Sequence, residues 1–401
     1  MSSRHATAPA RPVDDHRRRI EDALRPLAGR STETVPMAAA LDRRLAVDVY
    51  APLDLPVFRN SAMDGYAVAA ESVAIVPATL PLAGVVAAGN TEQLTLPAGS
   101  AVKVMTGAPV PPGADCVVPV EHTESDGVTV TIRTSRAPGD FVREPGTDVR
   151  AGQLLAAART LLRPRHIAAL AAVGLGELEV TRRVRAAVLT TGDELRPAGA
   201  TLLPGQIFNS NGIALAAALS DNGVEVVSVA HSTDEHAEFR RRLAEAVAQA
   251  DVVFTSGGVS MGDFEVVKEV LAAQGGEFGP VALQPGGPQG LSTVDGVPVL
   301  SFPGNPVSTM VSFEVFARPI LRELAGLPAL PVTALPLLDA VRSPAGKRQF
   351  LRGKLTGEGV TLVSGQGSHL IAAMAHADVL IDVPAEVTEL PAGTIVEVRP
   401  L

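Results

Sequence analysis

The stretch Thr255-Ser-Gly-Gly-Val-Ser-Met-Gly-Asp263 decides the fold of the region around it. It follows the apolar run 251–254 and precedes the apolar, helix-like segment 266–271. A strand, a loop of small residues and a helix start, in this order, are typical of an α/β unit. Such a loop brings backbone N–H groups close to an oxyanion, and the carboxylates of Asp263 and Glu265 can hold a metal ion.

The same alternation of strand and helix extends over residues 184–328. Apolar, strand-like runs occur at 184–189, 224–229, 251–254 and 297–302, and helical patterns at 211–222, 235–248, 266–273 and from Pro306 onward. Strongly apolar strands that alternate with helices predict a parallel sheet that is covered on both faces.

The rest of the chain divides into four parts by composition. We expect a disordered tail at 1–14, a discontinuous helical and linker domain at 15–56 and 149–183, a β-rich domain at 57–148 and a small C-terminal β domain at 329–401. Within these parts, helices are predicted at 15–27, 37–49 and 164–173, and a proline-rich linker at 326–336. The predicted fold class is a multidomain α/β protein with a central parallel-sheet domain.

Composition excludes several classes of protein. The net charge of −9, the 3% aromatic content and the absence of Trp argue against nucleic-acid binding. The single cysteine, Cys116, excludes an intrachain disulfide and a paired-cysteine metal site. The polar, Arg-rich N-terminus and the lack of an 18-residue apolar run predict a cytoplasmic protein that does not enter a membrane.

Three of the predicted strands end in polar, small-residue loops. In open parallel sheets, ligands bind beyond the carboxyl ends of the strands. Each loop alone is more often an ordinary turn or helix cap, but three at one edge favour a binding site for a phosphate-like ligand. The residues expected to contact this ligand are Thr191, Gly192, Asp193, Ser256, Gly257, Gly258, Ser260, Pro303, Gly304, Asn305, Pro306 and Ser308.

Carboxylates beside these loops suit a hard cation that bridges to phosphates. Glu194 follows the predicted strand 184–189, and Asp263 and Glu265 follow the predicted strand 251–254. Oxygen ligands of this type favour Mg²⁺. We therefore expect a magnesium site formed by Glu194, Asp263 and Glu265.

Two other segments carry polar side chains that a turn alone does not require. Ser61, Asp64 and Tyr66 lie close together in the segment 60–67, and Thr106 follows a predicted strand. Arg348 and Arg352 flank a strand of the C-terminal domain, where either one can reach an anion or lie on the surface. The sequence leaves both readings open for these segments.

Five of these segments, in this order and spacing, carry a family resemblance. They are Asn60-Ser-Ala-Met-Asp-Gly-Tyr-Ala67, Met105-Thr-Gly-Ala-Pro-Val-Pro111, Thr190-Thr-Gly-Asp-Glu-Leu195, Thr255–Asp263 and Pro303-Gly-Asn-Pro-Val-Ser308. Together they resemble the molybdopterin molybdenumtransferases, the family of the bacterial MoeA proteins and the gephyrin E domain. The similarity extends from about Ile20 to the C-terminus.

The resemblance implies an elongated homodimer with four domains per chain. It also implies that molybdate and adenylylated molybdopterin are substrates that give molybdenum cofactor and AMP, with Mg²⁺ as the cofactor. A molybdopterin adenylyltransferase and apo-molybdoenzymes are the partners that this reaction implies. By motif, the residues with implied roles are Asp64, Thr106, Asp148, Glu194, Asp234, Asp263, Glu265, Arg348 and Ser368.

Two departures from the family pattern keep alternatives open. The family carries lysines where this chain has Gln284 and Gly287, and it usually has Asp where this chain has Glu265. Gln284 is nevertheless expected to contact the substrate. The alternatives are a catalytically weak paralogue that acts as a pterin-binding scaffold and a molybdopterin adenylyltransferase.

Overall fold

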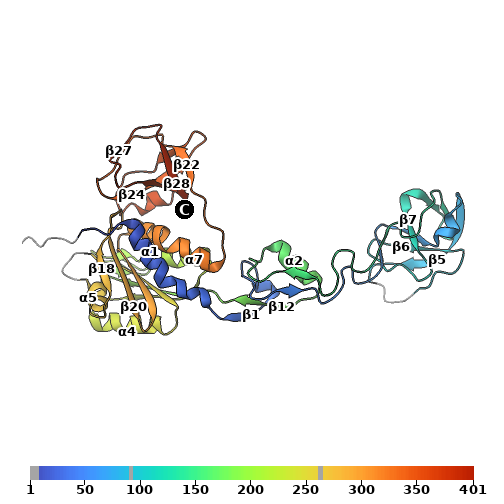
Figure 1. Ribbon diagram of the computed structural model, residues 1–401, viewed down its shortest axis with the longest axis horizontal. Helices are drawn as coiled ribbons and strands as arrows, with labels where there is room; N and C mark the ends of the chain where they lie inside the picture. The colour runs from blue at the N-terminus through green and yellow to red at the C-terminus, as the bar shows by residue number, and fades with distance from the viewer. Residues whose placement is uncertain (1–8, 90–93, 261–264) are drawn as a thin grey trace, which may run out of the picture. The chain divides into compact units, whose positions relative to one another are not determined.

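The computed structural model describes residues 9–89, 94–260 and 265–401, which belong to two compact units. One unit consists of Met1–Glu33 and Thr181–Leu401, and the other of Thr34–Val180. Figure 1 shows the elements of each unit.

A six-stranded sheet forms the centre of the larger unit. Its strand order is β16-β13-β17-β21-β20-β18. The first four strands are parallel, whereas β20 and β18 are antiparallel. The expected parallel sheet is therefore confirmed for four strands and extended by an antiparallel pair at one edge. The bounds are β13 (Arg185–Thr191), β16 (Glu225–Ser232), β17 (Val252–Ser256), β18 (Glu277–Pro280), β20 (Pro288–Val294) and β21 (Val297–Phe302).

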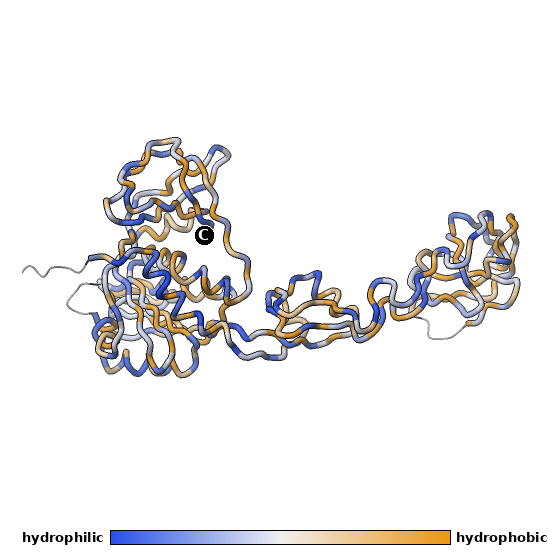
Figure 2. Tube along the Cα trace, in the orientation of Figure 1, coloured by the Kyte–Doolittle hydropathy of each residue, from blue (hydrophilic) through white to orange (hydrophobic). Residues whose placement is uncertain are grey.

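Helices cover both faces of this sheet, as the apolar strands predicted. Successive residues of β13 alternate between the two cores: Ala186 and Val188 pack with one, and Ala187 and Leu189 with the other. The first core is completed by α1 (Val13–Leu24), α3 (Ser210–Asp221), α6 (Pro306–Ser312), the π-helical turn η5 (Phe313–Ala317) and α7 (Arg318–Ala325). The second core is completed by α4 (His236–Val247) and α5 (Val266–Ala272). Figure 2 shows that the sheet strands are mostly apolar.

The C-terminal domain belongs to the same unit. Its sheet has the order β19-β24-β26-β28-β22, with β25 paired to β24. Strand β22 occupies part of the predicted linker, which is therefore shorter than expected. The elements are β19 (Leu283–Gln284), β22 (Thr333–Pro336), β23 (Val341–Arg342), β24 (Arg348–Leu355), β25 (Val360–Leu362), α8 (Ile371–Met374), β26 (Val379–Val383), β27 (Glu389–Leu390) and β28 (Ile395–Pro400).

The smaller unit contains the β-rich segment. A six-stranded sheet of order β7-β4-β6-β5-β9-β8 confirms the β content expected for 57–148. Its strands are β4 (Gly65–Val68), β5 (Ala78–Val86), β6 (Ala101–Val104), β7 (Cys116–Pro119), β8 (Thr123–Ser125) and β9 (Thr129–Ile132). The other short elements, which lie in this unit or at its ends, are β1 (Thr32–Pro36), β2 (Val49–Tyr50), β3 (Asn60–Ser61), β10 (Val142–Arg143), β11 (Leu154–Ala156), α2 (Pro164–Ala172) and β12 (Glu177–Thr181).

The helix predicted at 37–49 is wrong. Only the 3₁₀ turn η2 (Met37–Ala39) forms there. Leu45 is buried but lies in a β-bridge with Val180, and Leu41 is exposed. Asp42 adopts a left-handed conformation with φ 58°, which a continuous helix does not permit. The four-residue spacing of the two leucines therefore reflected one buried residue and one exposed residue rather than a helical face.

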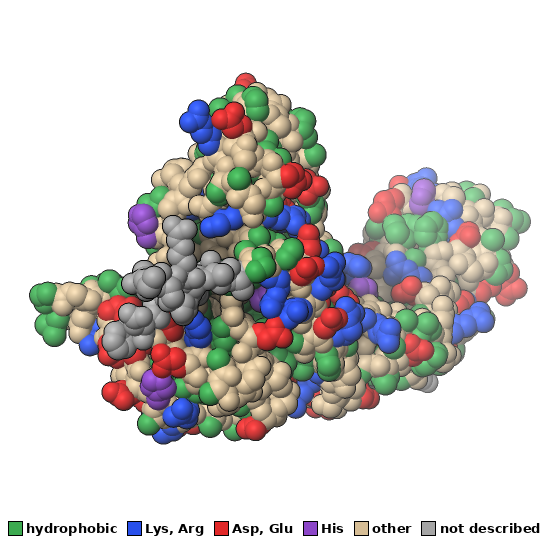
Figure 3. Space-filling view, turned by 60° about the vertical axis from the view of Figure 1, so that its left-hand side comes forward, with side chains coloured by type: hydrophobic (Ala, Val, Ile, Leu, Met, Phe, Trp, Pro, Cys, Tyr) green, Lys and Arg blue, Asp and Glu red, His purple; other side chains and the backbone are tan. Residues whose placement is uncertain are grey.

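The N-terminal segment is ordered earlier than expected. The predicted disordered tail is wrong for residues 11–14, because α1 begins at Val13 and Arg11 pairs with Glu277 at 2.9 Å. Val13 is buried in the core of the α/β domain. On the exposed side of α1, Arg17 pairs with Asp14 and Glu21, and acidic and basic side chains lie next to one another on the face shown in Figure 3.

Among the described residues, no helix is both long and apolar enough to cross a membrane.

The histidine of α1, His16, has a strongly lowered pKa. It is 1% exposed, its ring packs edge-on against Phe316 with centroids 4.8 Å apart, and its Nε2 has no hydrogen-bond partner. Burial, with the nearby charges of Arg11 and Arg19, lowers the pKa of His16 to about 3. The ring therefore stays neutral when the unfolded chain takes up a proton.

This pKa predicts an acid-dependent loss of stability. Below the unfolded pKa of 6.5, the unfolded state binds more protons, so the free energy of unfolding falls as the pH drops toward the folded pKa. At pH 5 the loss from this one group is about 2 kcal/mol relative to pH 7.5. We expect His16→Phe to reduce the pH dependence of urea unfolding, followed by circular dichroism, by this amount. His236→Gln on the exposed face of α4 is the control, and equal pH slopes for His16→Phe and wild type would contradict the assignment.

Candidate functional site

Three loops lie side by side at the carboxyl edge of the parallel strands. Thr190 of β13 is in register with Ser256 of β17, which is in register with Phe302 of β21. The loops that follow these strands therefore start at the same level of the sheet. This is the arrangement that the sequence predicted for the segments beginning at Thr190, Thr255 and Pro303.

Two residues that the sequence reading missed bind the loops after β17 and β21 together. Asn211 Nδ2 donates to Ser256 Oγ at 2.9 Å and to the Gly304 carbonyl at 2.7 Å. Thr309 Oγ1, which is fully buried in α6, lies 2.6 Å from the Pro303 carbonyl and 3.1 Å from Ser256 Oγ. Thr309 lies in the first helical turn after the third predicted loop, and Asn211 lies at the start of the helix predicted at 211–222; these positions were the available signals.

Gly257 allows the first two loops to touch through their backbones. It has φ +101°, and a Cβ at this position would lie 2.7 Å from the Thr191 carbonyl oxygen. A Cβ on Gly304 would lie 3.4 Å from the Gly257 Cα. The backbones thus approach more closely than side chains permit, which leaves peptide groups at the surface of the site. Gly258 is also left-handed, at φ +66°, and Ser260 is exposed.

Thr191 and Ser308 lie behind this surface rather than on it. Thr191 is 5% exposed, and its Oγ1 is buried without a hydrogen-bond partner. Ser308 is 3% exposed in the first turns of α6, after Pro306 at the first helical position. Pro306 is tolerated there because that position needs no intrahelical N–H bond.

A cluster of carboxylates lies beside the first loop. The backbone N–H groups of Asp193 and Asp234 each donate to the other residue's carboxylate, at 3.3 and 3.2 Å. The Glu194 carboxylate lies over Gly192, where a Cβ would be 2.5 Å from its Oε2. Burial, followed by the negative charges of Asp193 and Glu194, raises the pKa of Asp234. A bound cation would relieve this repulsion.

The expected magnesium ligands are not assembled in the described part of the chain. Asp263 lies outside the described residues, and Glu265 is the residue that precedes α5. Among the residues that are described, no group of three or more His, Cys, Asp or Glu side chains is arranged to hold a metal ion. The described residues alone therefore do not form a preformed magnesium site.

The C-terminal domain contributes a loop to the same edge. Asn305 Nδ2 donates to Ser368 Oγ at 3.0 Å, and the Val307 N–H donates to the Ser368 carbonyl at 3.1 Å. Both contacts are made at the start of α6, where free N–H groups favour anions. Ser368 is thus brought to the site that the sequence assigned to it.

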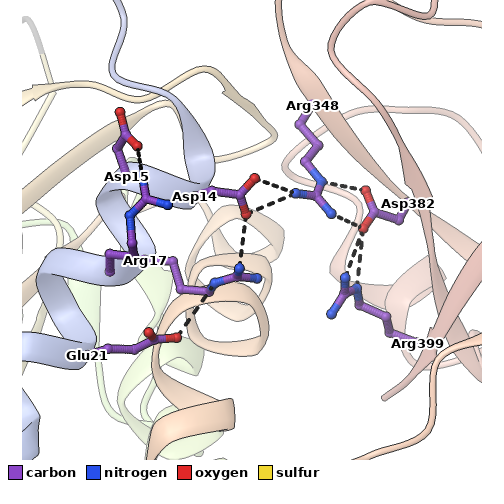
Figure 4. A network of polar contacts seen from close by, with 8 residues as sticks. Asp14, Asp15, Arg17, Glu21, Arg348, Asp382 and Arg399 are labelled. Carbon is purple, nitrogen blue, oxygen red and sulfur yellow. Dashed lines mark hydrogen bonds and ion pairs between the residues drawn. The ribbon is translucent and has the colours of Figure 1, made fainter.

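Arg348 is committed to ion pairs. Figure 4 shows its guanidinium between two carboxylates: it donates twice to Asp382, both at 2.7 Å, and to both carboxylate oxygens of Asp14, at 3.2 and 3.4 Å. Arg399 also pairs with Asp382, at 3.2 Å. These contacts join α1 to strands β24, β26 and β28 of the C-terminal domain. Arg348 therefore has a structural role that the sequence did not reveal.

Arg352, on the same strand, lacks such partners. It is 5% exposed and has no carboxylate within ion-pair distance among the described residues. Its guanidinium donates to the carbonyls of Gly365 and Gly367, next to Ser368, and burial lowers its pKa. A buried guanidinium whose charge is not balanced is suited to an anion.

The Gln284–Pro288 segment packs against α6. Gln289 Nε2 donates to the Gly286 carbonyl and to Ser312 Oγ, both at 2.7 Å. Gln284 pairs in register with Gln349 of β24, and its Oε1 is buried without a partner. This segment, where the family carries lysines, thus lies between the α/β domain and the C-terminal domain and contains no cation.

In the smaller unit, Asp64 and Thr106 form a fixed pair. The Thr106 N–H and Oγ1 both donate to Asp64 Oδ1, at 2.6 and 2.8 Å. These bonds lower the pKa of Asp64, so its exposed carboxylate is ionised at neutral pH. Ser61 is fully buried and donates to the Met63 carbonyl, which leaves it a role in the turn. Asp148 is exposed, and its N–H donates to the Leu55 carbonyl.

Comparison with known proteins assigns the chain to a family. The MoeA N-terminal region (domains I and II) matches residues 11–174, a probable molybdopterin-binding domain matches 187–323, and the MoeA C-terminal region (domain IV) matches 334–401. The chain belongs to the MoeA family of molybdopterin biosynthesis proteins.

Relatives and solved structures match over almost the whole chain. Molybdopterin molybdenumtransferase 2 of Mycobacterium tuberculosis is 43% identical, over 97% of this chain and 99% of its own length. Molybdopterin molybdenumtransferase of Synechococcus elongatus is 38% identical, over 95% and 96%. A crystal structure of a MoeA protein from Pyrococcus horikoshii, 30% identical, superposes with a TM-score of 0.78 over 98% of this chain and 99% of that chain. The predicted family and fold class are confirmed.

The hydroxyl of Thr309 provides a test of the loop arrangement. We expect Thr309→Val to lower the free energy of unfolding by about 2 kcal/mol, because it removes the shorter of the two hydrogen bonds to the buried Pro303 carbonyl and one partner of the Ser256 hydroxyl. Thr309→Ser keeps the hydroxyl and is the matched control, with a smaller loss. Denaturant unfolding followed by circular dichroism measures both, and equal losses in the two variants would refute the role of the hydroxyl.

Proposed function

We propose that the chain is a molybdopterin molybdenumtransferase, which joins molybdate to adenylylated molybdopterin and releases AMP. The observation that carries the proposal is the 43% identity to a protein of that name over nearly the full length of both chains. The reaction would take place in the cytoplasm. A molybdopterin adenylyltransferase would supply the substrate, and apo-molybdoenzymes would receive the product.

The geometry of the sheet edge supports a substrate with a pyrophosphate group. The backbones of Gly257 and Gly304 approach one another at the ends of β17 and β21, and α6 starts beside them. The Gly257 N–H donates to the Phe302 carbonyl, whereas Gly304 and Asn305 are exposed directly before α6. Peptide N–H groups at such a helix start bind phosphate oxygens without a cationic side chain. This accounts for phosphate binding by an acidic protein whose Gln284–Pro288 segment contains no lysine.

We assign molybdate binding to the surface between Ser368 and Arg352. Molybdate is a tetrahedral dianion that needs hydrogen-bond donors and positive charge. Arg352 supplies a positive charge that no carboxylate of the described residues balances. It also donates to the carbonyls of Gly365 and Gly367, which precede Ser368. Arg348, in contrast, is neutralised by Asp382 and Asp14.

Magnesium dependence is part of the proposal. We assign the cation to Glu194, Asp263 and Glu265. Burial, together with the negative charges of Asp193 and Glu194, raises the pKa of the neighbouring Asp234, so a cation at Glu194 would lie in a region of concentrated negative charge. When bound, the cation would offset charge on the phosphate oxygens. The carboxylates themselves orient the first loop through the paired backbone bonds of Asp193 and Asp234.

AMP release tests the function directly. Purified protein incubated with adenylylated molybdopterin and molybdate is expected to release AMP in proportion to the molybdenum cofactor formed, and chelation of divalent cations is expected to stop the reaction. If no AMP appears with Mg²⁺ present, the transferase assignment is wrong. Formation of adenylylated molybdopterin from ATP would indicate an adenylyltransferase instead.

The two arginines of β24 make the molybdate assignment testable. We expect Arg352→Gln to raise the KM for molybdate by about tenfold or more, because the anion loses a charged partner. Arg348→Gln is the matched variant, which should leave this KM within about twofold while lowering the midpoint of thermal unfolding. The reverse pattern of KM changes would assign the anion to Arg348.

A homodimer in which each site draws on both subunits would bring Asp64 and Thr106 to the sheet edge of the partner. The support is that the fixed, ionised pair Asp64–Thr106 lies in a different unit from the other site residues. At a molybdate concentration well below the KM of the Arg352→Gln variant, Asp64→Asn and Arg352→Gln should each have little activity alone. Mixed after subunit exchange, they should recover about a quarter of wild-type activity, since half of the dimers then contain one intact site. No recovery in mixtures shown to exchange subunits would place each complete site within one chain.

A further inference from the structure

A cavity lies beside the end of the helical segment that begins at the site. Helices α6, η5 and α7 run without interruption from Pro306 to Ala325, and the connector 326–332 then leads to the C-terminal domain. The cavity, of about 230 Å³, lies between α7, this connector and the end of β28. Its apolar wall consists of Val315, Pro319, Leu330, Val332, Leu380 and Pro400.

The polar side of this cavity is built mainly from arginines. Arg318 is 6% exposed and lines the cavity with Arg322 and Arg399. The only carboxylate among the lining residues is Glu314, which pairs with Arg318. Arg399 pairs with Asp382, which also serves Arg348. The lining therefore carries more positive than negative charge.

Arg322 is the cation without a carboxylate. Its guanidinium donates to the Pro328 carbonyl at 2.9 and 3.1 Å and to Asn222 Oδ1 at 2.9 Å, and within the described residues no Asp or Glu oxygen lies within 4.0 Å of it. Burial and the neighbouring charge of Arg318 lower the pKa of Arg322, and the more distant carboxylates of Asp221 and Glu314 offset this only in part. Arg318 Nε donates to Asn222 Oδ1, and its Nη1 donates to Glu314 and to the Pro400 carbonyl. Among the described residues, none accepts a hydrogen bond from its Nη2.

An apolar wall opposite unbalanced, oriented guanidinium groups is complementary to one class of ligand. A planar carboxylate accepts two parallel bonds from a guanidinium, and an apolar body fills the remaining space. The modest volume restricts that body to about one or two rings. We propose that this cavity, called here the connector cavity, binds a small amphipathic carboxylate, with its acid group at Arg322 and Arg318 and its apolar part against Leu330, Val332 and Leu380.

The probe for this site is 1-naphthoate, with the uncharged 1-naphthamide as its matched control. Equilibrium dialysis measures the bound naphthoate, so the readout is the same for the wild type and for a variant that introduces a Trp. We expect one naphthoate per chain with a Kd below about 1 mM, and binding of 1-naphthamide that is at least about tenfold weaker.

Three variants locate the binding. Arg322→Gln should weaken naphthoate binding by about tenfold or more, because it removes the free charge. Ala329→Trp should abolish binding, since Ala329 is an exposed lining residue whose enlargement fills the cavity without disturbing a core. Arg241→Gln, on the exposed face of α4, is the control and should bind as wild type does.

Each outcome decides the proposal. Absence of naphthoate binding at several millimolar, or equal affinity for 1-naphthamide, would overturn it. Undiminished binding in Ala329→Trp would place the ligand elsewhere and overturn it as well. If circular dichroism shows that Arg322→Gln is unfolded, Ala329→Trp decides alone, because its substituted side chain lies at the surface.

Discussion

The hydrogen bonds of two side chains hold the loops after β17 and β21 together, and the site depends on them. Asn211 and Thr309 both contact the Ser256 hydroxyl and the carbonyls of the loop after β21. Parallel strands align the starts of these loops, but register alone does not fix the loops that follow. The contacts of Thr309 with Ser256 and Pro303 are buried, so the loss of one leaves an unsatisfied polar group in the interior.

Electrostatics at the sheet edge combine two opposite environments. Asp193, Glu194 and Asp234 concentrate negative charge next to β13, whereas the C-terminal domain places a buried, uncompensated guanidinium at Arg352. The ion pairs among Asp14, Arg348, Asp382 and Arg399 keep other charges of the same domain occupied.

Much of this organisation could be predicted from the sequence, and the failures have identifiable causes. Strongly apolar strands that alternate with helices, such as β13, predicted the sheet and its two covered faces, and the polar loops after them predicted the edge at which the site lies. The helix expected at 37–49 failed because Leu41 and Leu45 have helical spacing but opposite exposure, and Asp42 turns the backbone left-handed. The antiparallel strands β18 and β20 were missed because their short, glycine-interrupted segments lack a clear pattern.

The contrast between Arg348 and Arg352 marks the limit of sequence reasoning for the site. Both arginines flank the same strand, and only the positions of Asp14 and Asp382, 334 and 34 residues away along the chain, show that Arg348 is neutralised. Likewise, the roles of Asn211 and Thr309 depend on contacts across 93 and 53 residues. Motif spacing contains no information on such distant pairs, whereas it does identify loops formed by neighbouring residues.

The hydrogen bonds between these loops also define the smallest part of the site that could be transferred to another protein. Transplanting the segment 255–260 into another α/β scaffold would leave its Ser256 hydroxyl without its hydrogen-bond partners Asn211 and Thr309. A graft would have to include everything from β13 to the end of α6, and in addition a surrogate for the Ser368 loop that contacts Asn305. In terms of protein engineering, the binding edge is one indivisible module of the α/β domain rather than a set of exchangeable loops.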